Sequence, residues 1–221
     1  MTYSRISPNR TSPRNHKIDT ITIHCIVGQW TAKQGCDYFA TTGRECSANY
    51  VVGKDGSIGL SVEEKDRSWC SSSRSNDHRA ITIEVASDTK HPYKVTDQAL
   101  AALIDLLVDI CRRNGIKALL WKGDKSLIGQ VDKQNMTVHR WFANKACPGD
   151  YLYNLHPQIA AQVNERLDAD APSEPEKKPT QTPSGATFTP YLVRITASVL
   201  NIRKGPGTTY AVAGQIKDRG V

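Results

Sequence analysis

Residues 20–27 read TITIHCIV, and residues 80–86 read AITIEVA. Both runs are short, rich in β-branched residues and apolar at most positions, which predicts two central strands covered on both faces of a sheet. They share the pattern Ile-Thr-Ile and then differ, because His24 follows in the first run and Glu84 in the second. Burying an imidazole or a carboxylate is costly unless the group is paired or binds a metal. These two strands therefore set the centre of the fold and the first place to look for chemistry.

Strand alternation places the two polar side chains. His24 shares a face with Thr22, and Glu84 shares a face with Thr82, because side chains alternate across a strand. If the strands are neighbours in one sheet, His24 and Glu84 project into the same cleft. Taken alone, the pair is explained more simply as a satisfied core histidine and a carboxylate at a strand end.

Helices are expected around these strands. Thr31 is a predicted N-cap of a helix over residues 32–43 that stops at Gly43. Thr96 caps the clearest helix, whose apolar residues recur at helical spacing up to Gly115. Pro157 predicts the start of a last helix, because proline is favoured in the first turn.

A hairpin is expected between the first helix and the second central strand. Residues 47–60 read SANYVVGKDGSIGL, in which Asp55-Gly56 is a turn signal between two strand-like runs. Helices and strands thus alternate along the chain. The predicted fold class is α/β, with a mixed central sheet flanked by helices.

A proline-rich segment divides the chain. Five prolines fall between Ala169 and Pro190, in a stretch with almost no apolar bulk, and such a stretch cannot fold alone. We therefore expect a domain over residues 1–168, a linker over 169–189 and a small C-terminal module over 190–221. Those 32 C-terminal residues are too few to bury a sufficient core by themselves.

Composition excludes some functional classes. The formal charge of +7 over 221 residues suits an anionic polymer such as a cell wall. A nucleic-acid binder is disfavoured, since no basic patch interleaved with aromatic residues is present. No stretch is long and apolar enough for a membrane span, and the polar N-terminus lacks the apolar core of a secretory signal. Synthesis in the cytoplasm, with release to the cell wall by another route, is the expectation.

Six cysteines are present and none forms a CxxC pair, which weighs against a zinc ribbon or a thioredoxin-like site. Cys36 and Cys46 could form a disulfide, although free thiols are favoured in a cytosolic product. Cys111 lies in the apolar helical pattern and is expected in the core.

A third segment changes the interpretation of His24. Residues 137–152 read TVHRWFANKACPGDYL and contain His139, Lys145 and Cys147. Two histidines and one cysteine suit Zn²⁺, and three protein ligands leave a fourth position open for water. The other four histidines are expected to be solvated at the surface: His16, His78, His91 and His156.

Four segments carry a family resemblance: TIHCIV, SANYVVGKDGSI, NDHRAITIEV and, most specifically, HRWFANKACPGDYL. They resemble the zinc-dependent N-acetylmuramoyl-L-alanine amidases, a superfamily that includes phage lysozyme-type amidases, autolysins and peptidoglycan recognition proteins. The resemblance spans residues 18–168 and points to phage or prophage endolysins of Gram-positive hosts. It implies a peptidoglycan hydrolase that cuts between N-acetylmuramic acid and L-alanine of the stem peptide.

The resemblance also implies roles for individual residues. His24, His139 and Cys147 match the family's zinc ligands, Glu84 matches its general base, and Lys145 matches a lysine that stabilises the oxyanion. Zinc activates a water in such sites. The expected cofactor is therefore Zn²⁺, and the expected partner is peptidoglycan.

Two positions depart from the family pattern. Ala48 stands where some relatives carry a catalytic tyrosine, so Tyr50 is expected to be a packing residue and Glu84 the stronger candidate base. Cys70 stands where relatives often carry a histidine, and it is expected to line the cleft.

The C-terminal residues suggest a second resemblance. The run LNIRKGPGTTY resembles the opening of a bacterial SH3-like domain, a cell-wall-binding module, here present only in part. The alternative function is a non-catalytic peptidoglycan-binding module that uses the same groove. Retention of His24, His139, Cys147 and Glu84 together disfavours it, because a pure binder needs no open metal site. The oligomeric state is left open, with a monomer sufficient for either function.

Overall fold

The computed structural model describes residues 1–41, 43–169, 200–203 and 211–216. The chain divides into two units, Met1–Pro172 and Ser173–Val221, and each is described by itself. The strands of the first unit are β1 (Tyr3–Ser4), β2 (Arg10–Thr11), β3 (Thr20–Val27), β4 (Tyr50–Val52), β5 (Ile58–Leu60), β6 (Arg67–Ser68), β7 (Ala80–Ser87) and β8 (Met136–Thr137). Its helices are α1 (Ala32–Phe39), α2 (Arg74–Arg79), α3 (Asp97–Asn114) and α4 (Gly149–Ala169), with short 3₁₀ turns η1 (Lys125–Leu127) and η2 (His139–Trp141).

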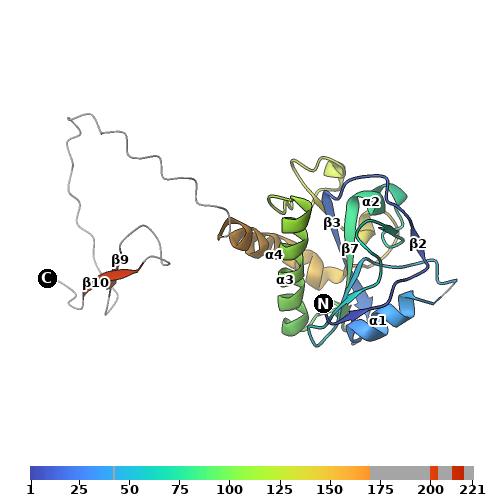
Figure 1. Ribbon diagram of the computed structural model, residues 1–221, viewed down its shortest axis with the longest axis horizontal. Helices are drawn as coiled ribbons and strands as arrows, with labels where there is room; N and C mark the ends of the chain where they lie inside the picture. Colours follow the sequence, from blue (N-terminus) through green and yellow to red (C-terminus); the bar gives the residue numbers. More distant parts are fainter. Residues whose placement is uncertain (42, 170–199, 204–210, 217–221) are drawn as a thin grey trace. The chain divides into compact units, whose positions relative to one another are not determined.

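A mixed six-stranded sheet forms the centre of this unit, with the strand order β1-β5-β4-β7-β3-β8. The strands β4, β7, β3 and β8 run parallel to one another, whereas β5 pairs antiparallel with β4. The runs TITIHCIV and AITIEVA lie in the adjacent central strands β3 and β7 (Figure 1). The predicted α/β class is confirmed.

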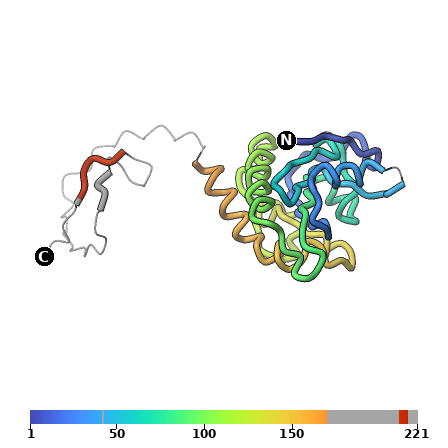
Figure 2. Tube along the Cα trace, turned by 90° about the horizontal axis from the view of Figure 1, so that it is seen from below, coloured from blue at the N-terminus to red at the C-terminus, as the bar shows by residue number. Residues whose placement is uncertain are grey.

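The main core lies between the sheet and helices α3 and α4. Four isoleucines of β3 and β7 are fully buried there against apolar residues of α3. Each such side chain contributes about 1.5–3 kcal/mol of burial free energy. Helices α3 and α4 lie side by side (Figure 2), in agreement with their contacts. The opposite face of β3 and β7 therefore remains for the threonines, His24 and Glu84.

The predicted helix caps and the predicted hairpin are present in the structure. The side chain of Thr31 accepts from the Gln34 N–H, and that of Thr96 accepts from the Ala99 N–H. Helix α3 ends at Gly115, which adopts the left-handed conformation that glycine tolerates best. Strands β4 and β5 pair as expected around the Asp55-Gly56 turn.

Helix α1 is shorter than predicted, ending at Phe39 and not continuing to Gly43. The Thr41 N–H donates to the carbonyl of Tyr38, three residues back. This tightened bond closes the last turn, which is how many helices end.

The predicted start of the last helix was wrong. Helix α4 begins at Gly149, and Pro157 lies inside it. An interior proline removes one helical hydrogen bond and costs about 3 kcal/mol. Buried residues flank the proline on both sides, Leu152 and His156 before it and Ile159 after it. Packing against the core therefore carries the helix through the proline.

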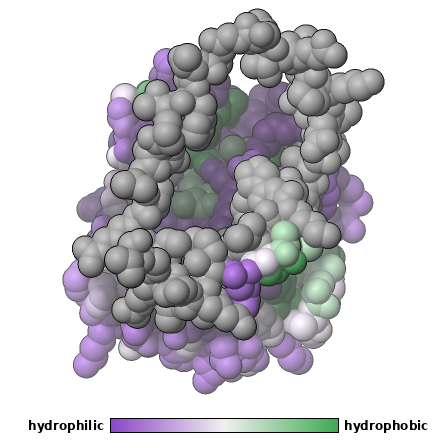
Figure 3. Space-filling view, turned by 90° about the vertical axis from the view of Figure 1, so that its left-hand side faces the viewer, coloured by the Kyte–Doolittle hydropathy of each residue, from purple (hydrophilic) through white to green (hydrophobic). Residues whose placement is uncertain are grey.

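The surface and the second unit add three observations. Hydrophilic residues make up most of the outline of the described part in the view of Figure 3. None of the helices in the described ranges is long and apolar enough to cross a membrane. In the second unit, β9 (Leu200–Arg203) and β10 (Val212–Ile216) pair antiparallel. Residues 170–189 of the predicted linker lie outside the described residues.

Candidate active site

Three adjacent strands bring the predicted site residues together. In the register of β3 and β7, His24 lies directly opposite Glu84. Thr22 of β3 lies opposite Thr137, the last residue of β8, so His139, two residues later, arrives beside His24. Because side chains two apart share a face, one face of the sheet presents Glu84, His24 and His139 in a row. The prediction that His24 and Glu84 project from the same face of the sheet is thereby confirmed, but His24 is fully buried and only Glu84 of the two lines the groove described below.

The row of threonines beneath the site holds these strands in place. Thr22 Oγ1 and Thr137 Oγ1 lie 2.7 Å apart. The Asn76 side chain donates to Thr22 Oγ1 at 3.0 Å and accepts from Thr137 Oγ1 at 3.0 Å. Thr82 Oγ1 lies 2.7 Å from Ser68 Oγ. A buried network that is fully paired in this way rigidifies its surroundings, so the side chains one row further on are held firmly.

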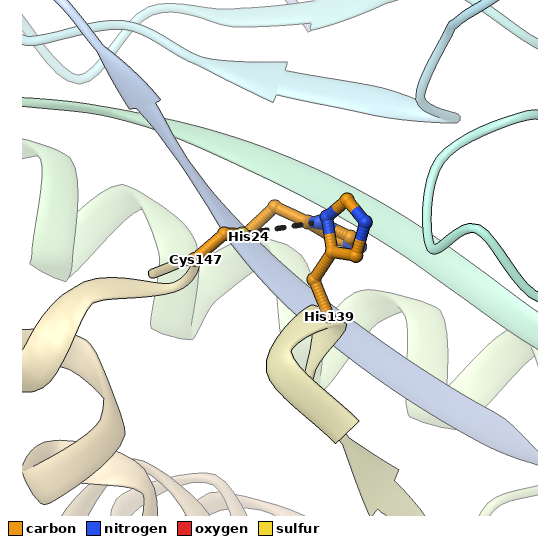
Figure 4. Close-up of side chains that lie close together, drawn as sticks. All are labelled: His24, His139 and Cys147. Carbon is orange, nitrogen blue, oxygen red and sulfur yellow. Dashed lines mark hydrogen bonds between the residues drawn. The ribbon is translucent and has the colours of Figure 1, made fainter. Parts of the chain in front are cut away.

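Cys147 completes a group of metal-ligating atoms. Its loop brings Sγ to 3.3 Å from His24 Nδ1, as the dashed line in Figure 4 shows. One ligand atom from each of His24, His139 and Cys147 lies within 4.8 Å of the others. Around a tetrahedral zinc, two nitrogen ligands lie about 3.3 Å apart and a nitrogen and a sulfur about 3.5 Å apart, given Zn–N and Zn–S bonds of about 2.0 and 2.3 Å. The donor set of two imidazoles and one thiol, at these separations, fits a zinc ion.

Electrostatics favour metal-binding forms of both histidines. Burial, and next the charge of His139, lower the pKa of His24 well below its usual value. Burial, followed by the charge of Lys145, also lowers the pKa of His139. Both imidazoles are therefore neutral at pH 7, as metal ligands must be. Contact with the Cys25 thiol and burial raise the pKa of Cys147, and a bound cation would reverse this by stabilising the thiolate.

Ser72 is a site residue that the sequence did not reveal. Its Oγ lies 2.9 Å from His139 Nε2, which leaves Nδ1 of that ring available to a metal. Outer contacts of this kind fix the tautomer and the orientation of a ligating histidine. Ser72 sits in the run Ser71-Ser72-Ser73, in which nothing distinguishes one serine from the next. Only the folded structure shows that Ser72, and not its neighbours, contacts His139.

Glu84 has the properties of an acid–base group. Burial raises its pKa from 4.5 to about 7, while a hydrogen bond from the Cys70 thiol opposes the rise. The Cys70 thiol donates to Glu84 Oε1 at 3.8 Å. Glu84 Oε2 is buried and accepts no hydrogen bond from the residues that the structure describes. A carboxyl group with a pKa near 7 can both take and return a proton at neutral pH.

A groove of about 470 Å³ opens beside these residues. Its walls are mainly apolar and aromatic, and Glu84 and His139 also line it. The lining residues include Trp30, Tyr38, Phe39, Trp69, Cys46 and Cys70. The expectation that Cys70 lines the cleft is confirmed. No residue could be assigned to substrate contact from the sequence, because tryptophans and tyrosines scattered over 40 positions show no pattern until the chain folds.

A second pocket of about 310 Å³ adjoins the groove and shares Cys46, Trp69, Cys70 and His139 with it. Its lining includes three basic side chains, Arg67, Arg74 and Lys145, and two acidic ones, Glu45 and Asp77. Lys145 is exposed at this rim. The fold therefore gathers His24, His139, Cys147 and Glu84 closely and places Lys145 at the mouth of the site.

The surface prediction was right for two of the other histidines and wrong for two. His16 and His91 are exposed, whereas His78 and His156 are buried. His78 Nδ1 accepts from the Asn15 N–H. His156 lies on the core side of α4, where its Nδ1–H donates to the Leu152 carbonyl. The misplaced helix start explains the error at His156.

The other expectations for single residues hold. Tyr50 packs in β4, with its hydroxyl donating to Glu64 at 3.0 Å. Cys111 is fully buried in α3. All six cysteines carry free thiols, Cys36 and Cys46 included.

Comparison with solved structures shows which folds are similar. A mutant endolysin from Bacillus subtilis matches with a TM-score of 0.55 and 16% identity, over 74% of this chain and 98% of the other. The catalytic domain of XlyA matches with a TM-score of 0.56 and 15% identity, over 74% and 99%. The Staphylococcus aureus hydrolase AmiA, solved with its ligand, matches with a TM-score of 0.54 and 16% identity, over 76% and 83%. At these identities the likeness concerns the fold.

Sequence comparison supplies the family. None of the curated proteins compared with the chain matches it in sequence. A family model described as N-acetylmuramoyl-L-alanine amidase matches residues 14–150, which is more than half of the 221 residues and contains every residue of the site described above. The chain therefore belongs to the N-acetylmuramoyl-L-alanine amidase family.

Proposed function

We propose that the amidase activity of this protein depends on zinc held by His24, His139 and Cys147, with Glu84 as the acid–base residue. The reaction of the family is hydrolysis of the amide bond between N-acetylmuramic acid and L-alanine of the peptidoglycan stem peptide. The observation that carries the proposal is the convergence of two imidazoles and a thiol beside a carboxyl group with a pKa near 7.

The metal and the protein have separate tasks. When bound, zinc polarises the scissile carbonyl and lowers the pKa of water at the site. The chain supplies the three ligands and keeps His139 oriented through Ser72, which contacts its Nε2. A substrate bound in the mainly apolar groove beside the site would displace water, and exclusion of water strengthens the interactions of charged groups.

Glu84 moves the proton. Its free carboxylate oxygen takes a proton from the attacking water as the new C–O bond forms at the lactyl carbonyl. It then gives that proton to the departing nitrogen as the C–N bond breaks. The products are a lactyl carboxylate and the free α-amine of L-alanine. A pKa of about 7 suits both halves of this exchange near neutral pH.

Lys145 contributes a positive charge at the edge of the site. Lys145 is near enough to lower the pKa of His139, and it borders the same pocket. A cation at that rim stabilises the oxyanion that develops on the carbonyl. A single group of this kind is worth roughly 10²–10³ in rate.

We also propose a division of the chain into three segments. Residues 1–168 form the catalytic domain, 169–189 a linker and 190–221 part of an SH3-like wall-binding module. The antiparallel pairing of β9 and β10 supports a small all-β element in that last segment. Endolysin-type action on the wall after release from the cell accords with the similar folds of a Bacillus subtilis endolysin and of XlyA.

Product analysis tests the function. Purified protein is incubated with bacterial cell walls, and the soluble products are analysed by mass spectrometry together with the metal content of the protein. We expect new L-alanine amino termini and about one zinc per chain. Intact stem peptides still joined to muramic acid, together with tight wall binding, would instead indicate a non-catalytic binding module.

Two kinds of variant separate the roles. Glu84→Ala is expected to keep zinc and lose cleavage, because it removes the proton carrier and leaves the ligands. Cys147→Ser is expected to lose cleavage and the tightly bound zinc held by His24, His139 and Cys147. A Cys147→Ser protein that cleaves walls without bound metal would contradict the ligand assignment.

A further inference from the structure

A second group of metal-ligating atoms lies beside the first and shares one residue with it. His24, Cys70 and Glu84 each offer one ligand atom, and these three atoms lie within 4.8 Å of one another. The Cys70 thiol contacts Glu84 Oε1 at 3.8 Å. His24 Nε2 and Glu84 Oε2 are both buried, and neither finds a hydrogen-bond partner within the described ranges. The three side chains therefore border one small volume, and two of them carry a buried polar atom that has no hydrogen-bond partner among the described residues.

We propose that His24, Cys70 and Glu84 form a second, overlapping site for a thiophilic divalent cation such as Zn²⁺ or Cd²⁺. An imidazole nitrogen, a thiolate and a carboxylate oxygen are a donor set that both ions accept. Cys70 binds as the thiolate, so its proton leaves for solvent as the S–metal bond forms. A cation here would give His24 and Glu84, each of which has an unpartnered buried polar atom, an electrostatic partner that the described residues do not supply.

The two sites compete because they share His24. Nδ1 of His24 faces Cys147 at 3.3 Å, and Nε2 is the unpartnered nitrogen. A neutral imidazole carries a proton on one ring nitrogen and a lone pair on the other. One cation therefore occupies one site or the other at neutral pH, and the His24 tautomer follows its choice.

Occupancy of the second site has a consequence for catalysis, which rests on the proposed function. A cation bound there takes Glu84 as a ligand, and that carboxylate is then unable to accept a proton from water. His24 is also withdrawn from the first site. The overlapping site therefore holds the cation in an inhibitory position.

Metal binding in variants of the full chain tests the proposal. Cd²⁺ binding is measured by equilibrium dialysis, and thiolate–Cd²⁺ charge transfer is followed by ultraviolet absorption. The starting variant is Cys147→Ser, which breaks the first site. Cys70→Ser and Cys46→Ser are then added separately. Cys46 is the matched control, since it lines the same groove and is half-buried but does not belong to the group.

We expect Cys147→Ser to bind about one Cd²⁺ per chain with thiolate absorption. Adding Cys70→Ser abolishes both signals, and adding Cys46→Ser leaves them unchanged. The same comparison in a His139→Ala background gives the answer again should Cys147→Ser fail to fold.

Two results would overturn the overlapping site: no Cd²⁺ bound by Cys147→Ser, or equal binding with and without Cys70. Loss of the tightly bound zinc in Cys70→Ser but not in Cys147→Ser would instead overturn the ligand set of the proposed function.

Discussion

Replacing Glu84 with glutamine is expected to make the metal-free protein more stable at pH 8 than its parent, although the change removes the catalytic carboxylate. Burial raises the pKa of Glu84 from 4.5 to about 7. A group whose folded pKa lies above its unfolded pKa adds stability that is fully present below the unfolded value. That contribution is lost as the pH rises through about 7. Glutamine never ionises, so the variant escapes this loss.

The size of the effect follows from the difference in pKa. At about 1.4 kcal/mol per pKa unit, a rise from 4.5 to about 7 corresponds to an upper limit of roughly 3–4 kcal/mol. Glu84 is half-buried, and partial solvation reduces the figure. We therefore expect the variant to gain about 1–3 kcal/mol relative to the parent between pH 5 and pH 8. The glutamine side chain also keeps an oxygen that can accept from the Cys70 thiol.

Urea unfolding at pH 5 and pH 8, with a chelator present, measures this difference. Glu165→Gln serves as the control, because Glu165 is exposed on α4. The control should change stability equally at the two pH values. If Glu84→Gln also shifts the midpoint equally at both, the carboxyl group is not desolvated in the folded protein and its assignment as a near-neutral acid–base group is refuted.

Three further outcomes test other parts of the structure. Lys145→Met is expected to lower kcat by about 10²–10³ while zinc stays bound, since an oxyanion loses its cation; unchanged kcat on soluble muropeptides would exclude that role. Ser72→Ala should weaken zinc binding about 10–100-fold in competition with a chelating indicator, because His139 Nε2 loses its 2.9 Å contact. An equal affinity would show that the contact does not orient the ring. Thr96→Ala should lower the free energy of unfolding by about 1 kcal/mol through loss of the α3 N-cap, whereas Thr96→Ser should keep most of that stability. Identical urea midpoints for the parent and Thr96→Ala would argue against the cap.

Local chemistry explains how much of the fold the sequence predicted. Runs of β-branched residues predicted β3 and β7, and a capping threonine with an apolar stripe predicted α3. These signals act over one or two turns or a few residues of strand. Pro157 misled the prediction of α4, because the energy that carries a helix through a proline comes from burial of Leu152, His156 and Ile159 against the core. Such packing has no local signal.

The same distinction holds at the site. The sequence alone was enough to identify the types and approximate order of the reactive groups. His24 and Glu84 each follow an Ile-Thr-Ile run, and His139 and Cys147 share one short segment. The tertiary structure decided their distances and their partners. The register of β3 with β7 and β8 placed Glu84, His24 and His139 in a row. It also chose Ser72 among three serines and set Cys70 against Glu84. The sequence specifies the residue types. Side chains that are tens to more than a hundred positions apart come together only when the sheet forms, because strand register and burial determine which side chains are in contact.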